Sequence, residues 1–290
     1  MFIFQNDWKV LPMAAIIAGM VSFVLGSSLF KTMEGTKMGT FALTCVCIWN
    51  GFFNSIQVVC RERPIVKREH RSGLHISSYI AAHMIYQAFL CLSQTVIIIL
   101  ICKIVGVAFP EKSMFFEWSI IDIGISLFLI TYSADMMALM VSSIVRSTTT
   151  AMTLMPFLLI FQLVFSGGFF NLPDNVLPIS NITISKWGLT VLCSQGDYNS
   201  LPMVSIWNNM VKLKNVEIGG EKPIKDLLIE VEKEGYNEWI MKQCGNQNQD
   251  PKYAFSADII LNCWKYLILF TICYAMIAVI FLEFIDLDKR

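Results

Sequence analysis

Charged residues are scarce in this sequence: Asp, Glu, Lys and Arg make up 15% of its 290 residues, whereas hydrophobic residues make up 55%. A soluble domain of this length carries about 25% charged residues. The shortage excludes a soluble globular protein, because this much apolar surface has to face lipid rather than water. The formal net charge is zero, so the placement of the charges is more informative than their sum.

Sequence motifs for nucleotide and metal binding are also missing. The chain has no G-x-x-x-x-G-K-[ST] phosphate-binding motif and no Gly-Lys pair. We therefore expect no ATP hydrolysis, no catalytic residue and no bound cofactor in this chain. Its three histidines, His70, His75 and His83, lack the spacing of metal ligands and convergent carboxylates, so we predict no metal site.

Seven of the nine cysteines lie in or beside apolar runs, where they are typical small core residues. Cys193 and Cys244 differ, because both fall in the one large polar segment. If that segment is extracellular, the two are a candidate disulfide pair.

The apolar runs predict an all-α integral membrane protein. A helix needs roughly 20 residues to cross about 30 Å of hydrocarbon, and backbone polar groups in lipid have to be satisfied internally. We predict a single transmembrane domain over residues 1–290, with six spans at residues 11–30, 39–60, 80–105, 118–141, 151–170 and 259–285.

The segment between the fifth and sixth spans, residues 171–258, is predicted to be an extracellular loop. Gly167 and Gly168 break the fifth span, and the apolar stretches that follow contain prolines, a pattern that favours short re-entrant helices. Further on, apolar residues at helical spacing between Pro223 and Gly235 predict an amphipathic helix in a small extracellular subdomain.

The only strongly basic short connection lies at residues 61–79, RERPIVKREHRSGLHISSY, with five Lys and Arg between residues 61 and 71 against two acids. Lys and Arg beside a span resist translocation, so we place this connection and both termini in the cytoplasm. Pro64 and Gly73 are expected to open and close a short rigid helix there. On charge alone, the basic residues need do no more than set the topology.

Polar residues inside the spans are costly and usually functional. Asn50 and Asn54 are four residues apart and share a helix face. For Asp135, near the inner end of the fourth span, we expect an ion pair with Arg146 or with an arginine of the basic connection.

Two separated motifs resemble those of a known family. Residues 61–64, R-E-R-P, precede K-R-E at residues 67–69 and Gly73, and residues 165–170, F-S-G-G-F-F, end the fifth span. The chain resembles the permease half of a type 2 ATP-binding cassette (ABC) exporter, most closely the White-like G subfamily. It departs from that group in lacking the cassette itself, and in carrying Leu74-His75 where an aromatic residue usually follows the glycine.

The resemblance implies a coupling helix and a translocation path shared by two permease chains, a homodimer or a heterodimer. The residues expected to couple to the ATPase are Arg61, Glu62, Lys67, Arg68, Glu69 and His70. Those expected to line the path are Asn50, Phe53, Asn54, Phe157, Phe161 and Phe165. Aromatic stripes at this spacing more often serve packing than binding, but such a wall suits an amphipathic or lipid-like substrate.

The implied partners are a second permease chain, membrane lipid and a cassette on another chain or on a removed domain, which binds the ATP and Mg²⁺. We expect a multi-pass protein of the plasma membrane that binds no nucleic acid. Two other classes stay open. An ion-coupled carrier would need several ionisable residues at mid-membrane, and a receptor-like scaffold would use the outer loop to bind a partner without transport.

Overall fold

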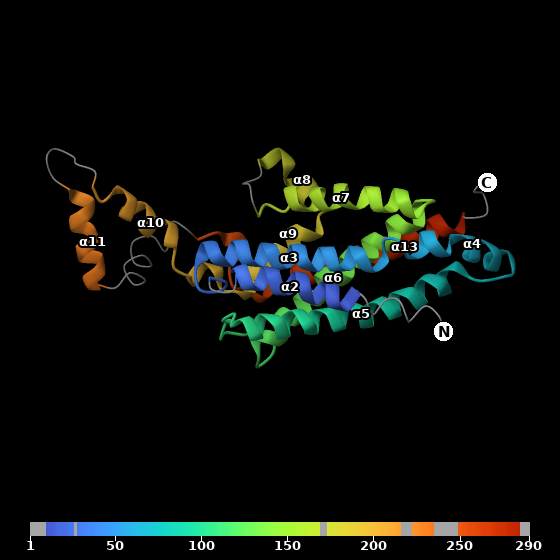
Figure 1. Ribbon diagram of the computed structural model, residues 1–290, viewed down its shortest axis with the longest axis horizontal. Coiled ribbons are helices and arrows are strands. Elements are labelled where there is room, and N and C mark those ends of the chain that lie inside the picture. The colour runs from blue at the N-terminus through green and yellow to red at the C-terminus, as the bar shows by residue number, and fades with distance from the viewer. Residues whose placement is uncertain (1–9, 26–27, 169–172, 216–221, 235–248, 285–290) are drawn as a thin grey trace.

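The computed structural model describes residues 10–25, 28–168, 173–215, 222–234 and 249–284. Within these ranges the regular structure is helical, without strands. The helices form an elongated bundle, with α4 (Val58–Arg71) at one end and α10 (Val204–Leu213) and α11 (Pro223–Glu234) projecting beyond the other (Figure 1). These are called the α4 end and the α10 end below.

Four candidate spans among the described residues are long and apolar enough to cross a membrane. They are α3 (Met33–Ser55) together with α4, α5 (Ile76–Val105), α6 (Ser119–Ile144) and α13 (Ala257–Glu283). The other two predicted spans are shorter apolar helices, α2 (Val10–Leu25) of 16 residues and α7 (Thr148–Val164) of 17. At 1.5 Å per residue these two are only about 25 Å long. The all-helical membrane class is confirmed, and the count of six spans stays a prediction.

Local signals set several helix ends, among them the two glycine ends that the sequence predicts. Gly73 ends the basic helix with φ +101°, and its N–H donates to His70 O at 3.0 Å. The Ser147 hydroxyl accepts from Thr150 N at 3.2 Å and so caps the start of α7. Gly167, just after α7, has φ +75°. Glycine suits these turns because it carries no Cβ to clash at positive φ.

The prediction that Pro64 opens the basic helix is wrong. A two-residue turn at Ile56 and Gln57 separates α3 from α4, and Pro64 lies six residues inside α4. Proline inside a helix removes the hydrogen bond to the residue four positions earlier and crowds that carbonyl, but its φ is helical, and α4 continues through Pro64. The break before Val58 therefore sets the start of the helix, and α4 is longer than the sequence suggests.

α6 is the central helix and packs against α3, α5, α9 (Ile184–Gln195) and α13. Small residues on α6 and its neighbours allow close contact, as in many membrane helix pairs. A Cβ on Gly51 of α3 would lie 2.4 Å from the carbonyl oxygen of Thr131 on α6. Trp264 of α13 donates to the Ser126 hydroxyl at 2.8 Å.

Short helices do follow α7, as the glycine and proline pattern indicates: α8 (Leu177–Ser180) and α9. α9 is wedged among α3, α6 and α13, and its Gly188 faces Thr44 and Ile130. Its dip into one membrane leaflet stays a prediction. The helix predicted after Pro223 is confirmed as α11, whose Val231 is buried.

Candidate functional site

α4 is tied to the turn between α6 and α7. The Cys60 N–H donates to the Ser142 hydroxyl at 3.1 Å. Arg63 Nη1 donates to two carbonyl oxygens at the end of α6, those of Ser143 at 3.0 Å and Val145 at 3.1 Å. These carbonyls are at a helix C-terminus, where they lack intrahelical donors. A cation placed there also interacts favourably with the helix dipole.

A second tie joins α4 to the start of α5. Glu62 Oε2 accepts from the Tyr79 hydroxyl at 2.7 Å and lies 3.4 Å from His83 Nε2. The Tyr79 and His83 rings meet edge to face, with centroids 4.6 Å apart. The Glu62 carboxylate therefore contacts Tyr79 and His83 of its own chain.

Beneath α4 is a separate hydrophobic cluster built from the ends of four helices. Its buried members are Val59, Val66, Ile76, Ile80, Met136, Leu139, Ala278 and Leu282. Because α4, α5, α6 and α13 all contribute, α4 is packed against the bundle as a rigid unit rather than as a loose loop.

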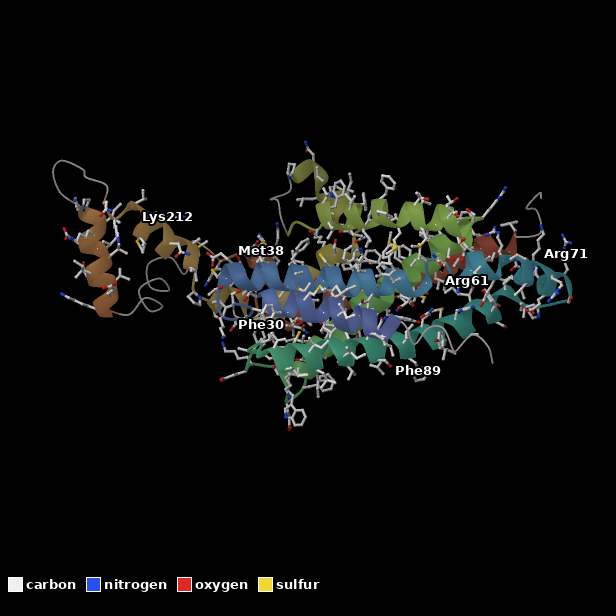
Figure 2. The ribbon with its side chains drawn as sticks, viewed as in Figure 1. Phe30, Met38, Arg61, Arg71, Phe89 and Lys212 are labelled. Atoms are coloured by element: carbon white, nitrogen blue, oxygen red, sulfur yellow. The ribbon has the colours of Figure 1, made fainter. Side chains whose placement is uncertain are left out.

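The far part of α4 presents charge to its surroundings. Arg61, Arg68, Glu69 and Arg71 are exposed, and Figure 2 shows Arg61 and Arg71 at the end of the molecule opposite Lys212. Of the predicted coupling residues, Arg61, Arg68 and Glu69 are exposed, Lys67 and His70 are half-buried, and Glu62 is hydrogen-bonded to Tyr79 of α5. Sequence reasoning missed Arg63, Tyr79 and His83. Arg63 occupies the variable position of R-E-x-P, so the motif gave no signal that would single it out.

The predicted path residues divide into two groups. Asn50 and Asn54 are 2% and 8% exposed, and both lie inside the chain. Asn54 exchanges two hydrogen bonds with Gln94 of α5, at 3.0 and 2.9 Å, and so joins α3 to α5. Asn50 Nδ2 is buried with no acceptor among the described residues.

Three of the four phenylalanines, Phe53, Phe157 and Phe161, are exposed instead, whereas Phe165 is half-buried. Phe53 of α3 is 42% exposed and Phe157 of α7 is 69% exposed. The rings of Phe161 and Phe165 follow along α7, 4.7 Å apart. α7 lies along one side of the bundle, and α3 runs beside α6 (Figure 1).

A comparison with known families identifies this arrangement. The sequence matches the model of the ABC-2 type transporter over residues 3–192, which is more than half of the chain. The chain belongs to the ABC-2 type transporter family. No curated protein matches it significantly. The match runs from α2 through most of α9 and so includes α4, α3 and α7.

An ABC-2 membrane domain is a transport subunit and not itself the catalytic part, and such permeases generally work with an ATP-binding cassette partner. This chain is therefore a permease component of an ABC transporter. Among its described residues, no three His, Cys, Asp or Glu side chains gather in a way that would hold a metal ion.

The expected ion pair of Asp135 in this permease is wrong. Asp135 is fully buried; its Oδ2 lies 3.9 Å from Cys91 Sγ, and its Oδ1 has no partner among the described residues. Arg146 lies eleven residues further on, a separation of about 16 Å along a helix. Asp135 belongs instead to a polar contact among α3, α5 and α6, close to Ser55 at the α3–α4 break.

Only one of the two cysteines of the candidate disulfide, Cys193, lies among the described residues. Cys193 is fully buried in α9, with its sulfur 3.1 Å from the Thr40 hydroxyl of α3. Cys244 lies outside the described residues, so the pairing stays a prediction.

Proposed function

We propose that this chain is the permease subunit of an ATP-driven exporter, which forms a dimeric path for an amphipathic or lipid-like substrate and is powered by a separate ATP-binding cassette. The observation that supports this most is the position of α4. Its charged end is exposed, while its base is hydrogen-bonded to α5 and to the turn that leads into α7.

The proposed coupling follows from these contacts. Closure of the cassettes displaces the exposed end of α4, around Arg68 and Glu69. The turn at residues 56–57, which interrupts the helix between α3 and α4, is the proposed hinge at which α4 tilts against α3. Arg63 carries the displacement to Val145 and so to the start of α7. A small shift at one end of a packed element is thereby passed to another helix.

A second copy of the chain, or a related permease chain, is proposed to pack on α3. From Met38 to Ser55 this helix is buried within its own chain except for one narrow stripe, formed by Met38, Ala42, Cys45, Trp49 and Phe53. Spacings of three and four residues are those of a helix that packs lengthwise against a partner. The exposed phenylalanines of α7 would then face the path beside this interface.

Cross-linking tests the proposed dimer. The test uses a chain in which the two half-buried cysteines, Cys45 and Cys273, are replaced by serine, together with Cys244, which lies outside the described residues. In that chain, Phe53→Cys is expected to give a cross-linked dimer with a short thiol reagent in native membranes. Phe89→Cys is the matched control, because Phe89 lies on α5 and is 67% exposed (Figure 2). Equal cross-linking of the two variants, or none from Phe53→Cys with any permease chain, would contradict the α3 interface.

A further inference from the structure

The ammonium of Lys186, near the start of α9, is held in one place by two neighbours. Its Nζ donates to the side-chain oxygen of Asn181 and lies 5.0 Å from the centre of the Trp187 ring. Trp187 is fixed in turn, because its Nε1 donates to the Asn181 carbonyl at 2.9 Å and its ring stacks on Tyr266 of α13, with centroids 4.0 Å apart. A lysine whose side chain is already ordered loses less conformational entropy when it binds a ligand.

The charge that acts most on Lys186 is another cation, Lys252, which lies just before α13 and is exposed. Burial, and then repulsion by Lys252, lower the pKa of Lys186. Neither lysine makes an ion pair with an acid among the described residues. The nearest acid in the sequence, Asp250, accepts from the backbone N–H of Lys252 at 3.0 Å. Two neighbouring cations without a paired acid attract an anion.

These two lysines lie near one membrane boundary, at the α10 end, where α13 begins (Figure 1). α13 has 27 residues, so at 1.5 Å per residue it is about 40 Å long, roughly 10 Å longer than the hydrocarbon of a bilayer is thick. Lys186 interacts electrostatically with Cys263, which lies about 9 Å along α13 from its start. A lysine at this depth extends its ammonium to the headgroup region.

Deeper along α13, the helix presents an apolar face to its surroundings. Leu269, Ile272 and Met276 are exposed, and spacings of three and four residues place them on one side of the helix. Lys265, one turn nearer the boundary, is exposed on the same side and adds a third positive charge. Cationic groups at the boundary, with an exposed apolar face beneath them, match the headgroup and the acyl chains of a phospholipid.

We propose that Lys186 and Lys252 bind the phosphate of an anionic phospholipid in the leaflet at the α10 end, with its acyl chains along the exposed face of α13. A zwitterionic headgroup also has a phosphate, but it brings its own cation beside the two lysines, so it binds less well. The bound lipid neutralises the repulsion between the lysines and joins α9 to α13. The proposal does not depend on export or on the cassette.

Native mass spectrometry of the full chain in detergent tests the site, with phosphatidylglycerol and phosphatidylcholine added in equal amounts. We expect the protein to retain phosphatidylglycerol preferentially. The double variant Lys186→Gln/Lys252→Gln is expected to bind phosphatidylglycerol about fivefold more weakly for each lysine lost, with phosphatidylcholine binding unchanged. Inorganic phosphate at the same concentration should not displace the lipid, because it has no acyl chains to contact α13. Displacement by phosphate would show a site for the free anion and overturn the lipid assignment.

Two further variants separate this site from the general attraction of lysines to lipid. Lys103→Gln is the matched control, because Lys103 is an exposed lysine in the last turn of α5, at the same end of the bundle. Lys252→Gln alone changes an exposed side chain, and it carries the test if the double variant fails to fold in a Tm measurement. Equal loss of phosphatidylglycerol in the control and in the site variants, or wild-type retention in all of them, would overturn the proposal.

Discussion

Replacing Arg63 by methionine is expected to uncouple the permease from its ATPase while leaving the chain folded. The guanidinium makes two hydrogen bonds to carbonyls at the end of α6, at 3.0 and 3.1 Å. Hydrogen bonds to a charged group are worth about 1.5–3 kcal/mol each. Since 1.36 kcal/mol changes a rate tenfold, loss of this tie predicts at least about a tenfold fall in substrate-stimulated ATP hydrolysis by the assembled transporter.

The controls for Arg63 separate geometry from charge. Arg63→Lys keeps the charge but loses the planar fork of donors, so it should recover only part of the coupling. Lys225→Met removes an exposed positive charge from α11, at the far end of the molecule, and should behave as wild type. Normal stimulation in Arg63→Met would show that α4 does not act through the α6–α7 turn.

Gly51→Ala is expected to be the most destabilising small substitution in the bundle. A Cβ at this position would lie 2.4 Å from Thr131 O, 2.7 Å from Asp135 N and 2.9 Å from Ala134 Cβ. Two of these are backbone atoms of α6, so no side-chain rotation relieves the clash and α3 has to move away from α6. Overpacking of this kind costs about 3 kcal/mol, which should lower Tm strongly in detergent and reduce the amount of folded protein.

The matched control for Gly51 is Gly19→Ala in α2. No atom lies within 4 Å of a Cβ at Gly19, so the change should gain up to about 1 kcal/mol of helix propensity. A Gly51→Ala protein as stable as wild type would contradict the close α3–α6 crossing.

Features set by local chemistry were predictable from the sequence. Composition and apolar run length gave the all-helical membrane class. Gly73 and Gly167 marked two helix ends because positive φ is a local property that glycine accepts. The pattern after Pro223 identified α11 because one apolar face repeats at helical spacing. The basic connection was found from charge alone.

Features that depend on contacts between helices were not predictable. Spacing put Asn50 and Asn54 on one face but gave no information about which neighbour that face meets, and Asn54 proved to bind Gln94. Arg63 was indistinguishable from the other basic residues until the carbonyls of the α6–α7 turn were placed beside it. The pairing of Asp135 with Arg146 was an avoidable error, because eleven residues of helix span about 16 Å. Its pairing with an arginine of the basic connection could be judged only once the helices were placed.

The central claim is that α4 connects this permease to a cassette ATPase, and co-purification tests it most directly. The chain, purified in lipid with the products of its neighbouring genes, should bring down an ATP-binding subunit. The double variant Glu62→Ala/Glu69→Ala should weaken that association or abolish stimulated ATP hydrolysis, because it removes the tie to α5 and an exposed charge of α4. A stable permease with no ATPase partner, or a complex indifferent to the double variant, would contradict the account.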